Sequence, residues 1–321
     1  MRRRPLLATG LAAGLAALAA TPALAQAGTV RFVVPFPPGG PVDTAARLLA
    51  AAMAGPLGQP ILVENRGGAG GTIGVDAVAK SAPDGLTLAF ASTGPASVAM
   101  SLIPGLPYDT LRDFAPVSIV GATPSLLVVR AASPVRSVAE LVALAKRRPG
   151  LTFGSTGPGG TPHLAPELLA LRAGIQLTHV AYRGAAPAIT ALLAGELDLS
   201  FHDLAVLLPH VREGSLRALA VASPVRSAVL PEVPTMAEAG VPGVETETWY
   251  PLLAPAATLP ARVAALHAAV VAALADAELQ RRFAAMGTRA IGNTPAEARG
   301  FIAAEIAKWG EVVRVANIRA D

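Results

Sequence analysis

The chain has 321 residues and a formal net charge of +4, from 26 basic and 22 acidic side chains, and it has no cysteine. Without cysteine it holds no disulfide, no thiolate metal site and no cysteine nucleophile. The length suits one or two domains with an ample core, and the lack of a basic run interleaved with aromatic residues argues against a nucleic-acid partner.

Residues 1–25 have the pattern of a secretory signal peptide. Arg2, Arg3 and Arg4 supply a positive start, residues 6–20 are apolar, and Ala23-Leu24-Ala25 matches a cleavage site. Cleavage near Ala25 leaves 23 basic against 22 acidic residues, a balance of +1. The sequence therefore predicts an exported protein whose mature charge says little about its partners. A retained membrane span and export by the twin-arginine route stay open as alternatives.

The first part of the mature chain alternates apolar strands with segments of helical spacing. In chain order we expect strand 30–36, helix 43–53, strand 61–64, helix 72–80 and strand 86–90. Such alternation indicates βαβ units around a parallel sheet.

The pattern restarts in the middle of the chain. We expect strand 126–129, helix 138–147, strand 151–153, helix 162–173, strand 178–181, helix 185–194, and strands 197–201 and 217–222. Ser137 and Glu140 form a capping-box pattern ahead of the first of these helices. The result is a second α/β unit over about residues 125–245.

Residues 246–254 then form an extended segment, followed by a helix at 260–275 and another that begins at the capping box Thr294-Pro295-Ala296-Glu297. These helices lack a sheet of their own, so we assign them to the first unit. Lobe I is then 26–124 with 249–321, and lobe II is 125–248. The chain crosses between them near 123–125 and 247–251, and a double crossing makes a hinge that suits closure around a ligand.

The phrase Pro-Gly-Gly occurs twice, and each copy opens a predicted helix. Pro38-Gly39-Gly40 follows the first strand, and Pro158-Gly159-Gly160 follows the strand that ends at Phe153. Glycine lets a ligand approach the backbone, and free N–H groups at a helix N-terminus attract anions. In an open parallel sheet both loops fall at the carboxyl ends of strands, where ligands bind. The repetition favours a cleft that holds a small carboxylate from two sides, although a tight turn needs the same residues.

Polar side chains beside these loops are further candidates. Asp43, at the third helical position, suits closure of the first loop through backbone N–H groups, with direct ligand contact as the alternative. Thr161 suits the N-cap of the second helix, and Ser155 and Thr156 precede it. Their hydroxyls are able to complete the hydrogen bonds of a carboxylate or to serve the turn itself.

Ser92 and Thr93 end the strand 86–90, so they should reach the same cleft. Asp203 ends another strand and suits either a hydroxyl or amine of the ligand or the cap of the next helix. Arg183, after Tyr182, suits either a ligand carboxylate or the protein surface.

Ser155, His163 and Asp203 together suggest a hydrolase, but the support is weak. A nucleophile elbow needs glycine two residues before the serine, and that position is Phe153. The five histidines lack metal-ligand spacing, and no dinucleotide or phosphate-loop motif is complete, so we expect no metal and no cofactor.

These motifs, taken in order, resemble those of the periplasmic solute receptors of tripartite tricarboxylate transporters, the Bug family. The stretches that carry the resemblance are 34–43 (VPFPPGGPVD), 57–60, 63–66, 68–71, 82–88, 154–165, 180–184 and 195–198. They span essentially the whole mature chain, and their order is more specific than any single one. One departure concerns the third loop, where the family often has Thr-His and this chain has Ser92-Thr93-Gly94-Pro95.

The resemblance implies a type II periplasmic-binding-protein fold, with two doubly wound α/β lobes joined by a two-segment hinge around a central cleft. It implies a periplasmic receptor, not an enzyme, that captures a small mono- or dicarboxylate and delivers it to membrane permease subunits. Family members hold the ligand carboxylate mostly through backbone N–H groups and waters of the two loops.

We expect a monomer whose ligand-binding residues are Phe36, Pro38, Gly39, Gly40, Asp43, Ser92, Thr93, Ser155, Thr156, Gly159, Gly160, Thr161, His163, Tyr182 and Asp203. A secreted hydrolase using Ser155, and a receptor whose loaded form docks on a signalling sensor, are the alternatives.

Overall fold

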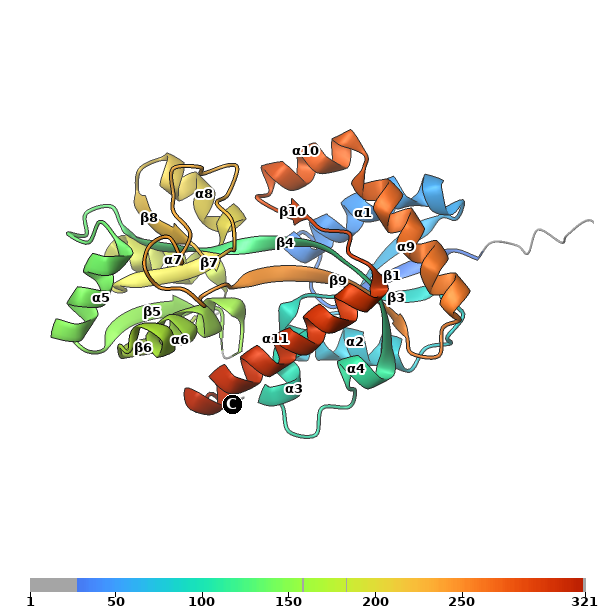
Figure 1. Cartoon of the computed structure of the whole chain (residues 1–321), viewed down its shortest axis with the longest axis horizontal. Helices are drawn as coiled ribbons and strands as arrows, with labels where there is room; N and C mark the ends of the chain where they lie inside the picture. The colour runs from blue at the N-terminus through green and yellow to red at the C-terminus, as the bar shows by residue number, and fades with distance from the viewer. Residues whose placement is uncertain (1–27, 158, 183, 320–321) are drawn as a thin grey trace, which may run out of the picture.

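The computed structural model describes residues 28–157, 159–182 and 184–319. The predicted signal peptide and its cleavage site, Pro158 and Arg183 lie outside the described residues. The elements form two groups along the longest axis of the molecule, joined by two long strands (Figure 1). We call them lobe I, built on the N-terminal strands, and lobe II, built on the middle of the chain.

Lobe I contains a mixed sheet in the order β2-β1-β3-β9-β4. Its strands are β1 (Val30–Val34), β2 (Ile61–Asn65), β3 (Thr87–Phe90), β9 (Glu247–Pro255), the first part of β4 (Phe114–Arg130) and the short β10 (Arg289–Ala290). β1 pairs in parallel with β2 and β3, whereas β9 and β10 are antiparallel to their neighbours. The helices are α1 (Pro41–Leu57), η1 (Ala69–Gly71), α2 (Thr72–Ala79), the π-helical turn η2 (Gly94–Val98), α3 (Ala99–Leu102), α4 (Thr110–Asp113), α9 (Pro260–Leu274) and α10 (Ala277–Ala285).

Lobe II contains the second part of the sheet. Its strands are β5 (Leu151–Ser155), β6 (Leu177–Ala181), β7 (Leu199–Asp203) and β8 (Leu216–Val221), and its helices are α5 (Val138–Arg147), α6 (Thr161–Ala173), α7 (Ala185–Ala194) and α8 (Leu204–Arg212). β5 is parallel to β6 and β7, and the end of β4 is antiparallel to β7 and β8. The alternation of parallel strands and helices read from the sequence is therefore present in both lobes.

The long strand β4 belongs to both lobes. Residues 114–124 pair with β9, and residues 125–130 pair with β7 and β8. The sequence predicted only 126–129 as a strand, because Pro116, Gly121 and Pro124 interrupt the apolar run. The pairing with β9 shifts register between Pro116 and Ser118 and again between Ile119 and Gly121, which accommodates two of these residues.

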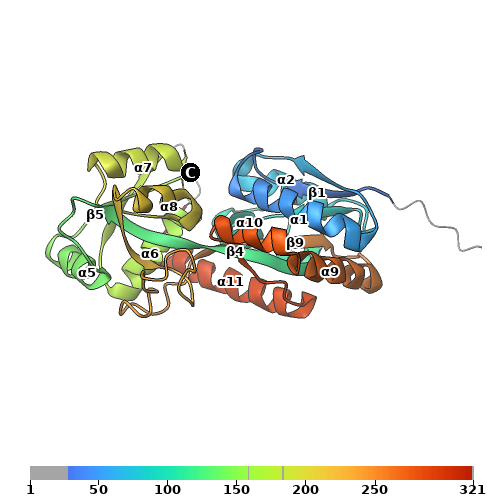
Figure 2. The same ribbon diagram turned by 90° about the horizontal axis from the view of Figure 1, so that it is seen from above.

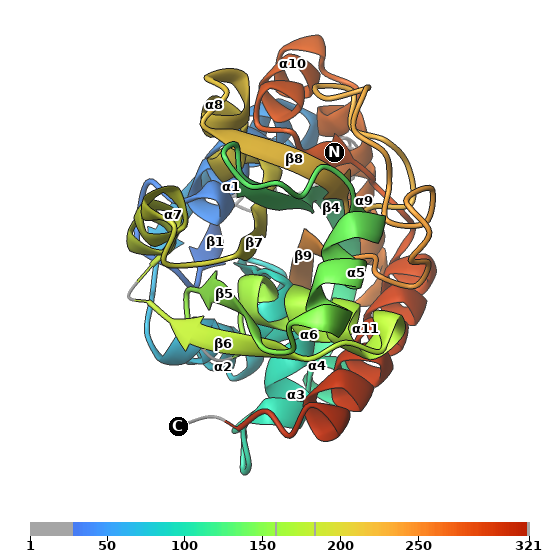
Figure 3. The ribbon, with the colours of Figure 1, turned by 90° about the vertical axis from the view of Figure 1, so that its left-hand side faces the viewer.

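The last helix, α11 (Pro295–Val315), packs on both lobes. Ala298 and Ile302 join a core cluster of lobe I, whereas Trp309 and Val312 join a core cluster of lobe II. Figure 2 shows this helix on the opposite side of β4 from α2 and α7, and Figure 3 shows it across lobe II from α7. The sequence placed the helix with lobe I alone, so its second role as a brace between the lobes is a finding of the structure.

Two predicted helix caps are present in different forms. Thr294 and Glu297 make the full reciprocal capping box at the start of α11. Ser137 accepts from the Glu140 N–H, but the Glu140 carboxylate accepts from the N–H of Arg136 instead of closing the box. Among the described helices no single one is long and apolar enough to cross a membrane, whereas α9 and α10 pass the same test as a pair bent by 75°.

Candidate ligand-binding site

The first glycine loop carries the chain from β1 into α1. Gly39 has φ +85°, in the left-handed region, and Gly40 is the helix N-cap with φ −76° and ψ 170°. The Gly39 N–H donates to Oδ2 of Asp43 at 2.8 Å, so the side chain four residues on closes the loop. This is the loop-closing role expected for Asp43.

The second loop, between β5 and α6, repeats this geometry. Gly159 has φ +75°, and Gly160 is the helix N-cap with φ −72° and ψ 157°. The Gly159 N–H donates to Nδ1 of His163 at 3.2 Å, again four residues on. Thr161 is the first residue of α6 and not its N-cap, so that part of the prediction was wrong: Gly160 already supplies the extended cap conformation.

Both loops leave backbone donors at the helix ends. The hydrogen bonds of α1 begin with the Thr44 N–H, which donates to the Gly40 carbonyl at 2.9 Å. The N–H groups of Gly40 and Val42 come before it and have no partner within the helix. In α6 the first such bond starts at His163, so the N–H groups of Gly160 and Thr161 are in the same position. Each loop therefore offers donors with a positive helix end behind them, which suits an anion.

The charge of the two anchors differs. Asp43 is buried, which opposes its ionisation, but hydrogen bonds from Arg47, Gly39 and Asn65 outweigh this and lower the pKa of Asp43. Arg47 Nη2 lies 3.0 Å from Oδ1, so the carboxylate is paired. Burial, and then repulsion from His179, lower the pKa of His163 to about 4, so that anchor is neutral at pH 7.

The two loops flank one segment of lobe I. A Cβ at Gly159 would lie 2.1 Å from Cδ2 of Leu102 and 3.7 Å from Cγ1 of Val98, so the second loop touches η2 and α3. Pro95, also in η2, and Phe36 of the first loop both lie against Gly71, since a Cβ there would be 3.1 Å and 3.2 Å from them. Segment 95–102 thus runs beside both loops.

Ser155 has its hydroxyl engaged within the loop. It is fully buried, its Oγ accepts from the Gly157 N–H at 3.0 Å, and it lies 2.6 Å from Nε2 of His179. Asp203 instead pairs with Thr248, so Ser155, His163 and Asp203 do not form the triad that a hydrolase would need. Sequence spacing gave no signal for His179, because the strand β6 brings it to Ser155 from 24 residues away.

The remaining predicted residues differ in their hydrogen bonds and in their exposure. The Thr93 hydroxyl donates to the Glu247 carbonyl and accepts from the Trp249 N–H, both at 3.0 Å, which ties the end of β3 to β9. Ser92 is buried beside it, and Thr156 and Pro38 are exposed. Tyr182 packs near Gly154, where a Cβ would lie 3.3 Å from its ring.

Asp203 lies at the junction between lobe II and the hinge strand. The Thr248 hydroxyl donates to its Oδ1 at 2.8 Å and lies 3.5 Å from the hydroxyl of Thr161. Burial raises the pKa of Asp203 to about 6, against the effect of the Thr248 hydrogen bond. Thr248 was missed because its strand brings it to α6 only in the folded chain. Across the described ranges, no three His, Asp or Glu side chains gather as metal ligands.

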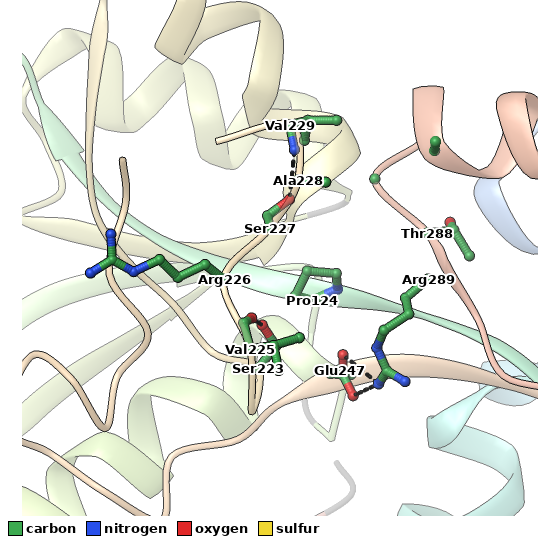
Figure 4. Close-up of a pocket in the computed structure, with 12 residues that line it drawn as sticks. Pro124, Ser223, Val225, Arg226, Ser227, Ala228, Val229, Glu247, Thr288 and Arg289 are labelled. Atoms are coloured by element: carbon green, nitrogen blue, oxygen red, sulfur yellow. Dashed lines mark hydrogen bonds and ion pairs between the residues drawn. The ribbon is translucent and has the colours of Figure 1, made fainter. Parts of the chain in front are cut away.

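A separate cavity of about 220 Å³ lies at the hinge (Figure 4). Ser223 and residues 225–229 of lobe II line one side, Ala284 and residues 287–289 line the other, and Pro124 and Glu247 lie between them. Glu247 and Arg289 form an ion pair at 2.9 Å, which partly offsets the burial that raises the pKa of Glu247. None of the predicted ligand-binding residues lines this cavity.

Comparison with known proteins adds a family. Residues 45–318 match the model of the tripartite tricarboxylate transporter family receptor. Protein BugT of Bordetella pertussis is 42% identical over 287 residues, covering 89% of this chain and 88% of that protein.

Solved structures agree with this match. The periplasmic binding protein BugD is 32% identical with a TM-score of 0.76 over 91% of this chain and 99% of that one. MatC from Rhodopseudomonas palustris with bound malate is 36% identical, with a TM-score of 0.76 over 89% and 98%. Rpa4515 of R. palustris with adipate is also 36% identical, with a TM-score of 0.79 over 91% and 98%. These likenesses confirm the predicted α/β fold of periplasmic binding proteins.

Proposed function

This chain belongs to the tripartite tricarboxylate transporter family of receptors, and on that premise we propose that its two glycine loops together bind one small mono- or dicarboxylate without chemical conversion. The observation that carries the proposal is the repeated loop geometry, with matched backbone angles and matched bonds from Gly39 to Asp43 and from Gly159 to His163. The malate and adipate bound to similar proteins are carboxylates of the expected size.

The free donors provide enough binding energy for a useful receptor. A hydrogen bond to a charged group contributes about 1.5–3 kcal/mol. Four such bonds, reduced by the cost of association and loop ordering, are consistent with micromolar affinity, or about −8 kcal/mol. In this account the receptor works in the periplasm and passes its ligand to permease subunits, as its family membership suggests.

The test is calorimetry with malate, adipate and the neutral diamide of adipate, on wild type and two matched valine variants. Gly40→Val introduces a side chain at the first loop, where a Cβ would lie 3.9 Å from the Pro37 carbonyl oxygen and the backbone angles suit any residue before proline. Gly55→Val changes the same helix far from the loop, where no atom beyond the neighbouring residues and the backbone of the helix lies within 4 Å of a Cβ. We expect Gly40→Val to weaken carboxylate binding at least tenfold and Gly55→Val to leave it within twofold.

Binding of the diamide as tightly as adipate, or equal affinity in Gly40→Val, would contradict the two-loop anion site. A thermal-shift screen gives the first candidates, since a ligand at 100 times its Kd adds about 2.7 kcal/mol of stability. Turnover of esters that is lost in Ser155→Ala would favour the hydrolase alternative. Docking of the loaded protein on a sensor kinase, with no effect on uptake, would favour a signalling role.

A further inference from the structure

The second loop is anchored by a neutral ring, which limits the conditions under which it keeps its shape. The Gly159 N–H donates to Nδ1 of His163 at 3.2 Å. A ring nitrogen that accepts a hydrogen bond carries no proton, so this bond exists only while His163 is neutral. Protonation at Nδ1 would set two donors against each other at the point where the loop turns.

We propose that His163 is a positioning residue that holds the second loop in its ligand-binding form only while its ring is neutral, so that acid weakens carboxylate binding. The inference rests on the proposed function, because the affinity concerned is that of the two-loop site. It gives His163 a role through the backbone of Gly159 and not through direct contact with the ligand.

The groups packed against His163 fit this role. The ring of His179, on β6, stacks on it with centroids 3.8 Å apart and planes 11° apart, so two positive charges there repel. Glu167, one turn along α6, has Oε1 3.8 Å from Nε2, and burial raises its pKa, which weakens its support for a charged ring. Phe153 covers another side without charge, and Asp203 accepts from the Thr248 hydroxyl, which lies 3.5 Å from the hydroxyl of Thr161 on α6.

His179 has a hydrogen-bond acceptor beside its ring that allows it to carry a second proton, whereas Nδ1 of His163 faces a donor. Its Nε2 lies 2.6 Å from the Ser155 hydroxyl, and that hydroxyl is 3.1 Å from the Gly157 carbonyl. A proton on Nε2 of His179 can donate to Ser155 while Ser155 donates to Gly157, so the loop survives the first protonation. The bond to Gly159 is lost when a proton reaches His163, against the charge already on His179.

Two amide substitutions at position 163 distinguish the effect of the hydrogen-bond acceptor from the effect of protonating the ring. His163→Asn places Oδ1 close to the position of Nδ1 and does not titrate, whereas His163→Gln extends its amide toward the position of Nε2 and leaves Gly159 without its acceptor. Calorimetry with malate and adipate from pH 7.5 to pH 3.3, which lies below the pKa of His163, follows the Kd. Ionisation of the probe is common to all variants, so it cancels in the ratio of wild type to variant.

We expect the Kd of wild type to rise at least fivefold more than that of His163→Asn over this range. At pH 7.5, His163→Asn should bind at least fivefold more tightly than His163→Gln. The matched control is His202→Asn, since His202 is another buried histidine of lobe II whose pKa burial lowers to about 4, on the strand β7 and outside the loop. That variant should keep the wild-type dependence of Kd on pH.

Equal pH dependence in wild type and His163→Asn, or equal affinity of the Asn and Gln variants, would overturn the inference. Failure of wild type to bind any carboxylate would instead reject the proposed function. In that case exchange of the Gly159 amide proton, followed by NMR, still tests the anchor. It should be slow at pH 7.5 in wild type and His163→Asn and at least tenfold faster in His163→Gln, and equal rates would reject the positioning role.

Discussion

The two glycine loops have the same backbone and different anchors. Each places a glycine with positive φ before an N-cap glycine, and each closes with a bond from the first glycine to the side chain four residues on. In lobe I that side chain is ionised Asp43, paired with Arg47, and in lobe II it is neutral His163, stacked on His179. The comparison shows that the loop needs only an acceptor, and that its charge is free to differ between the lobes.

The charge has a cost that the structure offsets. A carboxylate behind an anion site repels the ligand, and Arg47 and the Asn65 amide compensate for it in lobe I. Lobe II avoids the problem with a neutral anchor and depends on pH instead. The first loop is thus built to be stable in acid, and the second loop to be free of charge.

A large expected difference between the loops comes from valine at the second loop. Gly159→Val differs in this respect from Gly40→Val, which we expect to block the ligand. In the structure Gly159 has positive φ and a Cβ would lie 2.1 Å from Leu102, so a β-branched residue strains the backbone and forces that side chain to move. We expect Gly159→Val to lower the free energy of unfolding by about 2 kcal/mol or more.

Urea denaturation of the two valine variants measures this difference. Gly40→Val should unfold within about 0.5 kcal/mol of wild type, since its site is open and its φ is negative. Equal stability of the two variants would show that the loops are less different in their surroundings than the structure indicates.

The next effect distinguishes the two anchors. Asp43→Ala removes the acceptor of three donors, from Gly39, Arg47 and Asn65, and should cost about 2–4 kcal/mol of unfolding free energy. His163→Ala removes one neutral hydrogen bond and a stacked ring, and should cost about 1–2 kcal/mol. Denaturation of both variants at pH 7.5 checks the order, and a larger loss for His163→Ala would reverse the ranking of the anchors.

As the pH falls, the second loop should be affected before the first. The folded-state pKa of His163, about 4, lies below its ordinary value of about 6.5, so the unfolded chain binds more protons between these values. The free energy of unfolding therefore falls as the pH drops through this window, by about 2 kcal/mol at pH 5 from this group. The pKa of Asp43 is lowered, so its contribution is present above its ordinary value of about 3.9 and is lost only in stronger acid.

NMR at pH 7 and pH 4, where about half of His163 is protonated in the folded protein, checks this order through the amide resonances of Gly39 and Gly159. The Gly159 resonance should move with pH while that of Gly39 stays in place. Movement of Gly39 before Gly159 would contradict the assigned anchors.

Much of the fold could be predicted from the sequence because it follows from local patterns of apolar residues and helix caps. The parallel strands around β1 and β5, their helices, and the box at Thr294 follow from periodicity and capping, and these are present. The long strand β4 was missed in its first half because bulges admit prolines and glycines that local rules exclude. The contact of α11 with both lobes was missed because the apolar face of a helix does not indicate which lobe it packs against.

Only the backbone of the site could be predicted from the sequence. The two loops and the closure by Asp43 follow from residue types at fixed spacing. The partners that decide side-chain roles come from distant strands: His179 on β6 engages Ser155, and Thr248 on β9 engages Asp203. No spacing rule connects these pairs, because the pairing of strands sets their distance.

The most direct measurement of the two-loop site is an NMR titration of the labelled protein with malate or adipate, whichever binds more tightly. If both loops grip one carboxylate, the amides of Gly40, Val42, Gly160 and Thr161 shift together, with a single Kd and a single equivalent of ligand. Shifts confined to one loop, or two different Kd values for the two loops, would contradict the account.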